Sequence, residues 1–283
     1  MASLVAMPLS YQHPSMAFVG KRRTITRASN LSENSPLLRA AKQMVDTYIK
    51  NGMVIGLGSG NASAMAIQYL GSKLRAGALN GIIGIPTSEA NASKAEEAGI
   101  PLDQYQDSSQ IDFAFDDADI IEEGTLHAVI GRRRFLGEEF IIQEKSILNA
   151  AEKLVFMIKS DQYGGCLDGS IPVLVHHLNW RETAEKIDDL FLGDAEVWRR
   201  SSIGQAGPLG GDFPFVTREG YNVLDILFTS PIESLAQVAE SLNKVDGVVD
   251  HGIITKFPCT AVIVSENGLS VVDSLSTNAH DGL

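Results

Sequence analysis

The sequence has very little cysteine and no long apolar run. Two isolated cysteines, Cys166 and Cys259, are too few for a disulfide framework or a zinc site, so both are expected to be small core residues in a reducing compartment. No uncharged apolar stretch approaches the roughly 18 residues that a membrane-spanning helix needs. The sequence therefore predicts neither a disulfide-stabilised scaffold nor an integral membrane protein.

Positive charge is also scarce, with 23 Lys and Arg residues against 35 Asp and Glu residues and a formal net charge of −12. This balance argues against a nucleic-acid partner, although a few backbone N–H groups and cations are enough to hold a small phosphate ester. The 283 residues are 44% hydrophobic and 20% charged, which is ordinary globular composition. We expect one large or two modest domains with a sizeable core.

Acidic residues are absent from the first 32 positions. This segment carries Lys21, Arg22, Arg23 and Arg27 among several serines and threonines. A basic, hydroxyl-rich and acid-free leader is typical of an organelle transit peptide, and its Met-Ala-Ser opening resembles chloroplast leaders. We therefore predict a transit peptide over residues 1–32 and a location in the chloroplast stroma. A disordered basic tail is the alternative.

The pattern of the remaining chain favours alternating strands and helices. Ser35 and Pro36 begin a first helix that ends at Asn51-Gly52. The expected strands are 53–57, 82–86, 111–115 and 154–158, and the expected helices between them are 61–74, 88–98 and 141–151. This alternation predicts an α/β fold whose parallel sheet is covered on both faces. After a boundary at about 161–170, apolar segments predict a mixed α+β unit, and residues 199–211 are expected to form a long surface loop.

A glycine-rich turn follows the first expected strand and contains Gly56, Gly58 and Gly60. Glycines let the backbone approach a ligand closely, and the helix that follows presents free N–H groups with a partial positive charge. Ser59 and Asn61 add short polar side chains, so the turn suits a phosphate group. Neither the dinucleotide-binding fingerprint nor the P-loop motif is complete here. A tight turn without a ligand is the alternative.

Acidic and basic side chains at three further places are candidates for ligand binding or catalysis. Asp116, Asp117 and Asp119 end an expected strand, and strand ends of this kind face the crevice of an open α/β sheet. Glu144, inside an expected helix, is a candidate base for proton transfer. Residues 132–134 are three arginines that suit phosphate binding. The alternative is a solvated acidic loop for the aspartates, an exposed helical glutamate for Glu144 and a solvated surface cluster for the arginines.

The order of these motifs along the chain resembles that of the A-type ribose-5-phosphate isomerases. Within that family, the chain most resembles a divergent plant chloroplast form. The resemblance spans roughly residues 36–273. The matching segments are Gly56-Leu57-Gly58-Ser59-Gly60, Pro86-Thr87-Ser88, Phe115-Asp116-Asp117-Ala118-Asp119, Glu144-Lys145, Ala151-Glu152-Lys153, Val216-Thr217 with Gly220-Tyr221-Asn222-Val223-Leu224-Asp225, and Val245-Asp246-Gly247-Val248-Val249-Asp250-His251-Gly252.

The resemblance implies a fold, an activity and partners. The fold is a Rossmann-like α/β domain, here 36–168 with 260–283, and a smaller α+β domain, here 169–259. The activity is interconversion of ribose 5-phosphate and ribulose 5-phosphate through an enediolate, in the pentose-phosphate pathway and the carbon-fixation cycle. It implies a sugar-phosphate substrate, a homo-oligomer, and neither cofactor nor metal; none of the six histidines stands in a metal-binding spacing.

The resemblance also implies site residues. Glu144 takes the place of the catalytic base, and Asp116 and Asp119 those of the acids that hold sugar hydroxyls and assist ring opening. The substrate phosphate is expected at the turn formed by Ser59, Gly60, Asn61 and Ala62. The family has a lysine that stabilises the enediolate oxygen; the matching stretch, 130–137, has three arginines and no lysine, and we expect Arg132 to bind substrate.

Several positions depart from the family pattern. Asp117 replaces a glycine, and residues 132–134 replace the lysine and most of the glycines after it. Asn61-Ala62 replaces a Ser-Thr pair, and a second family lysine falls near Gln162, with Lys159 close by. These departures leave a second hypothesis open, in which the chain is a catalytically weakened relative that binds a sugar phosphate or serves as a regulatory partner subunit.

Overall fold

A computed structural model of the chain describes residues 35–107, 109–132, 141–164, 167–202, 208–209 and 213–274. Its helices are α1 (Pro36–Tyr48), α2 (Asn61–Arg75), α3 (Glu89–Ala98), α4 (Ile141–Ala150), α5 (Trp180–Leu190) and α6 (Leu235–Asn243). Its strands are β1 (Val54–Leu57), β2 (Ile83–Pro86), β3 (Ile111–Asp117), β4 (Ile120–Glu122), β5 (Ala128–Val129), β6 (Ala151–Lys159), β7 (Tyr163–Gly164), β8 (Leu167–His176), β9 (Ala195–Arg199), β10 (Tyr221–Ile232), β11 (Val248–His251), β12 (Ile253–Ile254), β13 (Cys259–Ser265) and β14 (Gly268–Asp273). None of the helices in these ranges is long and apolar enough to cross a membrane.

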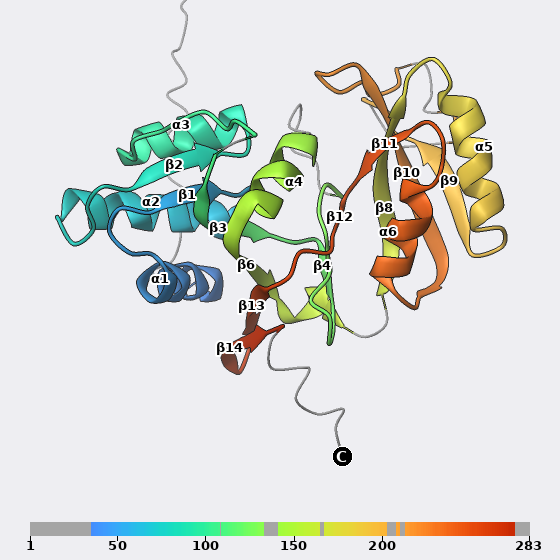
Figure 1. Ribbon diagram of the computed structural model, residues 1–283. Coiled ribbons are helices and arrows are strands. Elements are labelled where there is room, and N and C mark those ends of the chain that lie inside the picture. The colour runs from blue at the N-terminus through green and yellow to red at the C-terminus, as the bar shows by residue number, and fades with distance from the viewer. Residues whose placement is uncertain are drawn as a thin grey trace, which may run out of the picture. The chain divides into compact units, whose positions relative to one another are not determined.

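The largest sheet has six strands in the order β14-β13-β6-β3-β1-β2 (Figure 1). Each neighbouring pair from β13 to β2 is parallel, and β14 alone pairs antiparallel, along β13. The strand order reverses between the neighbouring strands β1 and β3: the chain adds β2 outside β1, and later adds β6 outside β3. In open α/β sheets, ligands bind at such a point. The α/β fold class with a parallel sheet is thus confirmed.

Alternate side chains of the sheet face two separate hydrophobic cores. Phe113 and Phe115 of β3 pack with residues of α1 and α2, whereas Ala114, between them, packs with residues of α4. This alternation is the two-residue period of a strand, and it places helices on both faces of the sheet. Helix α4 therefore lies on the opposite face from α1 and α2 (Figure 1).

A second, antiparallel sheet has the order β11-β8-β10-β9. Helices α5 and α6 share one hydrophobic core with β8 and β10, to which Ile187, Leu235, Val173 and Leu224 contribute. A sheet covered by helices in this way is an α+β unit. The exact domain boundaries, 36–168 with 260–283 and 169–259, stay a prediction.

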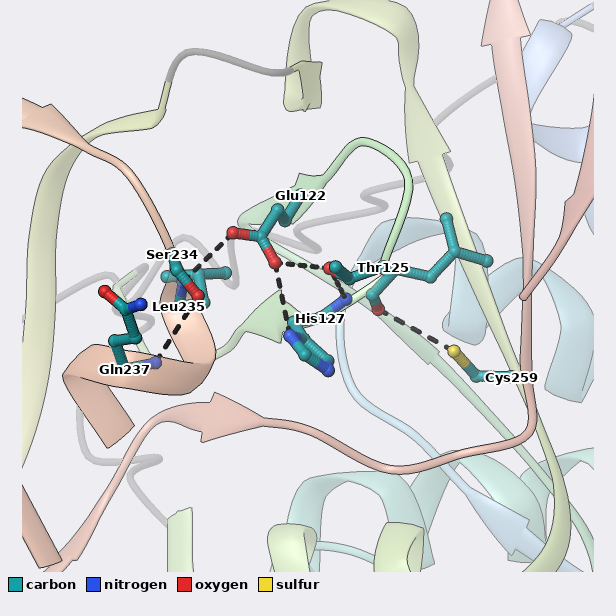
Figure 2. Close-up of polar contacts among 8 residues, drawn as sticks. Glu122, Thr125, His127, Ser234, Leu235, Gln237 and Cys259 are labelled. Atoms are coloured by element: carbon teal, nitrogen blue, oxygen red, sulfur yellow. Dashed lines mark hydrogen bonds and ion pairs between the residues drawn. The ribbon is translucent and has the colours of Figure 1, made fainter. Parts of the chain in front are cut away.

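A small sheet, β12-β5-β4-β7, contributes side chains to two of the cores: Ile121 to the core beneath α4 and Ile120 to the core of the α+β unit. Figure 2 shows how β4 is tied to α6. The Glu122 carboxylate accepts a hydrogen bond from the backbone N–H of Leu235 (3.0 Å) and one from the Thr125 hydroxyl. It therefore satisfies an N–H at the start of α6 that has no partner within the helix.

Cys259 lies beside this cluster (Figure 2), with its thiol 3.7 Å from the carbonyl oxygen of Leu126. It is buried, and burial raises the pKa of its thiol to about 11. A thiol with such a pKa is inert at neutral pH. The prediction of a core cysteine is confirmed for Cys259, while Cys166 lies outside the described residues.

The expectation that residues 199–211 form a surface loop is wrong at its start. Arg200 directly follows β9 and is fully buried. Its guanidinium donates to both carboxylate oxygens of Asp225, at 2.9 Å and 2.5 Å, and to the carbonyl oxygen of Gly131 at 3.0 Å. A buried arginine is stable only when a carboxylate neutralises it, and a pattern of neighbouring residues does not reveal that partner.

Candidate active site

A glycine turn joins the end of β1 to the start of α2, as predicted. A side chain at Gly58 would collide with the carbonyl oxygen of Phe115 on β3, so the turn packs against that strand with no space between them. Gly60 has φ +101°, a conformation that residues with a Cβ atom rarely adopt. The two glycines therefore bring the turn and the start of α2 directly against the carboxyl end of β3.

Two acidic residues at that end of β3 bind the turn. Oδ1 of Asp116 accepts the backbone N–H of Ser59 at 2.7 Å and that of Asp117 at 2.9 Å. The Asp117 carboxylate accepts the N–H of Ala62 at 2.9 Å and both the N–H and the hydroxyl of Ser63, each at 2.8 Å. These bonds satisfy N–H groups at the start of α2.

Glu144 comes to the same place from α4, on the other face of the sheet. Its carboxylate oxygen Oε1 accepts a hydrogen bond from the Ser59 hydroxyl at 2.5 Å, and the residue is 8% exposed. Glu144, Asp116 and the Ser59 turn therefore converge in space, although they lie on three separate elements. An exposed helical glutamate, the alternative for Glu144, is excluded by this burial.

The environment of Glu144 suits a base that works near neutral pH. Burial raises the pKa of its carboxyl to about 6, an effect that bonds from Ser59 and Asp116 oppose and the nearby Asp119 and Asp117 reinforce. A general base works best when its pKa lies close to the working pH. At pH 7 a group with a pKa of about 6 is ionised in roughly ten molecules out of eleven.

Asp116 is more deeply buried than Glu144. Complete burial, together with the charges of Glu144 and Asp117, raises the pKa of Asp116 well above its ordinary value. Its oxygen Oδ2 has no donor among the described residues, yet Asp116 lies within hydrogen-bonding reach of Glu144. A proton on Asp116 satisfies both carboxyls, because it can be donated to an ionised Glu144. Two buried, interacting acids with raised pKa values are typical of sites for acid–base chemistry.

Asp119 lies two residues beyond β3, next to the backbone of Arg132. Its oxygen Oδ2 accepts the N–H of Arg132 at 2.7 Å. The guanidinium of Arg132 donates to the carbonyl oxygens of Ser170 and, at 2.8 Å, Asp168, both on β8. These contacts do not test the prediction that Arg132 binds substrate. Residues 133 and 134 lie outside the described part of the chain.

Gln162, near which the second family lysine is expected, is buried. Its amide nitrogen donates to the carbonyl oxygens of Ala118 at 2.6 Å and Asp119 at 3.4 Å, so it holds the loop that carries the acids. Lys159 is exposed.

Sequence reasoning missed a cluster behind Glu144. The Lys145 ammonium donates to Asp250 at 2.5 Å and to the carbonyl oxygen of His251 at 2.9 Å, which joins α4 to β11. His251 is 2% exposed, and burial together with the Lys145 charge lowers its pKa to about 4. The only sequence signal was that Lys145 adjoins Glu144 and that Asp250-His251 falls in a matching motif.

The fold and the site together define a class of protein. A buried carboxyl with a pKa near neutrality, a second acid in contact with it and a glycine turn at the carboxyl edge of a parallel sheet are the parts of an acid–base enzyme that acts on a small polar substrate. Among the described residues no group of three His, Cys, Asp or Glu side chains is arranged to hold a metal ion.

Comparisons with known proteins identify the family. Residues 83–268 match the family described as ribose 5-phosphate isomerase A (phosphoriboisomerase A). The chain is 32% identical over 237 residues to ribose-5-phosphate isomerase A of Gloeobacter violaceus, covering 82% of this chain and 94% of that protein. It is 31% identical over 247 residues to "Probable ribose-5-phosphate isomerase 3, chloroplastic" of Arabidopsis thaliana, covering 86% of this chain and 84% of that protein.

Solved structures give the same result. Ribose 5-phosphate isomerase A from Methanocaldococcus jannaschii superposes with a TM-score of 0.71 at 29% identity, covering 84% of this chain and 97% of that one. A ribose-5-phosphate isomerase in complex with phospho-erythronic acid has a TM-score of 0.72 at 26% identity, with the same two coverages. The chain belongs to the ribose 5-phosphate isomerase A family.

Proposed function

We propose that this protein is an aldose–ketose isomerase that interconverts ribose 5-phosphate and ribulose 5-phosphate. The curated relatives named ribose-5-phosphate isomerase match this chain over most of their length. One solved relative is in complex with phospho-erythronic acid, a four-carbon sugar-acid phosphate. The observation that carries the proposal is the buried carboxyl of Glu144, which is bonded to Ser59 of the glycine turn and has a pKa of about 6.

Glu144 is the proposed base. In the open-chain aldose its ionised carboxylate takes the proton from C2, and the electron pair left behind forms the C1–C2 double bond of an enediolate. The carbonyl oxygen at C1 gains a proton while the hydroxyl at C2 loses one. Glu144 then returns its proton to C1, which yields the ketose and the starting form of the enzyme. A positioned base of this kind contributes about 10²- to 10⁴-fold to the rate.

Asp116 and Asp119 are proposed to hold sugar hydroxyls and to assist ring opening. A protonated Asp116 can donate to an oxygen of the substrate, and the position of Asp119 beside the 130–132 backbone supports a role at the edge of the site. Arg132 remains the proposed cation for the enediolate oxygen or the phosphate. That role requires its guanidinium to leave the carbonyl groups of β8.

The proposed contact for the substrate phosphate is the turn of Ser59, Gly60, Asn61 and Ala62. N–H groups at the start of a helix suit a phosphate group, and here those of Ala62 and Ser63 bond to Asp117. The proposed proton transfer uses side-chain groups alone and needs no cofactor or metal.

We further propose that residues 1–32 direct the protein to the chloroplast stroma, where the reaction serves the pentose-phosphate pathway and the carbon-fixation cycle. The chloroplastic relative and the acid-free basic leader support this location. A fusion of residues 1–35 to a fluorescent reporter tests it, and a cytosolic signal would refute it. A homo-oligomer is also proposed, and sedimentation of the purified chain tests it.

The decisive experiment is ribulose 5-phosphate formation by the purified chain and by Glu144→Gln. We expect turnover that falls at least about a hundredfold in the variant. The matched control is Glu152→Gln, which changes an exposed glutamate close in sequence and should keep the wild-type rate. Binding of ribose 5-phosphate without turnover by the wild-type chain would favour a sugar-phosphate-binding relative, because the lysine and the glycine-rich loop of the family are replaced here.

A further inference from the structure

The phosphate-binding turn already holds an anion that belongs to the chain itself. Asp117 projects from the end of β3 onto the start of α2, where its two oxygens accept three hydrogen bonds from the N–H groups of Ala62 and Ser63 and the hydroxyl of Ser63. Asn61 contributes a further backbone N–H. These are the donors that a phosphate oxygen would use at a helix N-terminus.

The Asp117 carboxylate also fills the space next to Gly60 in the turn. A Cβ atom at Gly60 would collide with the Asp117 carboxylate, which therefore lies directly against the backbone of the turn. Gly58, on the other side, has no free space towards Asp116. A phosphate group could bond to the N–H groups of Ala62 and Ser63 only by displacing the Asp117 carboxylate. A phosphate bound next to that carboxylate would be repelled by its negative charge.

Local sequence explains why Asp117 is held there. Helix α2 has no acidic residue in its first turn, and Gly60 at its N-cap has no side chain to accept a hydrogen bond. The helix therefore lacks the usual side-chain cap, and a carboxylate from a neighbouring strand supplies it. Burial raises the pKa of Asp117, and the bonds from Ala62 and Ser63 oppose that rise by stabilising the ionised form.

We propose that Asp117 is a specificity-determining residue that occupies the anion-binding start of α2 and weakens the binding of phosphate esters there. The choice of sugar phosphate as the ligand rests on the proposed function, but the occupied donors do not. The protein thus binds the phosphate end of its substrate more weakly than the same site would with a glycine at position 117.

The test is the binding of inorganic phosphate, ribose 5-phosphate and ribose by calorimetry, which needs no turnover. We expect Asp117→Gly to bind both phosphate ligands about tenfold more tightly or better, because a set of charge-assisted hydrogen bonds becomes available. Affinity for ribose should not change. Asp117→Asn keeps an acceptor for α2 but removes the like charge, so a smaller gain is expected.

Asp112→Asn is the matched control. Asp112 is on the same strand and also accepts a backbone N–H, that of Val54 at 2.7 Å, but it lies at the opposite end of β3. Its substitution should leave phosphate affinity unchanged. Unchanged phosphate affinity in a folded Asp117→Gly chain overturns the proposal. If the glycine variant fails to fold, Asp117→Asn decides: no gain for either phosphate ligand overturns it as well.

The two proposals fail separately. Tighter phosphate binding in Asp117→Gly without isomerisation by any variant would uphold the role of Asp117 and refute the isomerase. Turnover that depends on Glu144, with phosphate affinity independent of position 117, would uphold the isomerase and refute the role of Asp117.

Discussion

The Ser59 hydroxyl donates to Oε1 of Glu144 across 85 positions of sequence. Ser59 belongs to the turn between β1 and α2, whereas Glu144 belongs to α4 on the other face of the sheet. The bond stabilises the ionised carboxylate and lowers its pKa, against the larger effect of burial. The turn that is proposed to receive the substrate therefore also adjusts the proposed base.

This relationship predicts a shift in the pH profile of Ser59→Ala. The proposed mechanism requires ionised Glu144, so kcat/KM of the wild-type chain should fall as the pH drops through about 6. Without the Ser59 hydroxyl the carboxylate loses a stabilising bond and its pKa rises. The acid limb of the profile should therefore move to higher pH, with a loss of rate at pH 7.

Ser93→Ala is the control for this experiment. Its hydroxyl donates to the carbonyl oxygen of Glu89 on the exposed side of α3 and contacts no group of the site. The profile of this variant should superpose on that of the wild type. An acid limb that stays in place in Ser59→Ala would show that the bond does not control the base.

A second prediction concerns stability. The folded-state pKa of Glu144, about 6, exceeds its ordinary value of 4.5, so the folded protein holds the proton more tightly than the unfolded chain does. The stability that this gives is present below pH 4.5 and is lost as the pH rises through about 6. At pH 7.5 the ionised carboxyl should therefore lower the free energy of unfolding by about 2 kcal/mol.

Glu144→Gln removes that charge and keeps an acceptor for Ser59. Urea unfolding at pH 7.5 should show the variant to be more stable than the wild type, while the difference should shrink towards zero near pH 4.5. A variant that is less stable at pH 7.5 would contradict the assignment of a raised pKa.

Much of the α/β unit was predictable because its signals are local. Pro36 at the first position of a helix, three glycines after a short apolar strand and the alternation of Phe113 and Phe115 with smaller residues each lie within a few positions of sequence. Helix α5 was not among the predicted elements, although Trp180, Ala184 and Ile187 recur at the spacing of a helix and pack in the core of the α+β unit.

The sequence singled out candidate residues of the site but not their contacts. The motif order placed Glu144 and Asp116 at one edge of the sheet, yet it could not show that Asp117 turns towards α2. Whether a side chain at a strand end faces the crevice or a helix depends on the space left by Gly58 and Gly60, which is a property of the packed structure.

Arg200 and Asp225 provide a third prediction. Asp225→Asn removes the carboxylate charge that bonds to the buried Arg200 guanidinium and should reduce the free energy of unfolding by about 3–5 kcal/mol. Replacing both residues, as Arg200→Met with Asp225→Leu, removes the charge and its partner together and should cost much less. Glu240→Gln, which breaks an exposed pair with Lys244, is the control and should have no measurable effect in urea unfolding.

His251 should govern how the protein responds to acid. Burial holds its folded-state pKa at about 4, below its ordinary value of 6.5, so the unfolded chain binds the proton more tightly. The stability from neutral His251 is present above pH 6.5 and is lost as the pH falls through about 4, to a total of about 3 kcal/mol.

The variant His251→Asn tests this prediction. Its amide oxygen can still accept a hydrogen bond from the N–H of Ile253, which in the wild type bonds to Nδ1 of His251 at 3.1 Å. Urea unfolding from pH 7.5 to 4 should therefore show a smaller loss in the variant than in the wild type. The opposite contribution of Glu144 cancels in this comparison, because both chains contain it. His177→Asn, at an exposed position, should keep the wild-type slope; equal slopes for all three chains would mean that His251 is not buried as a neutral group.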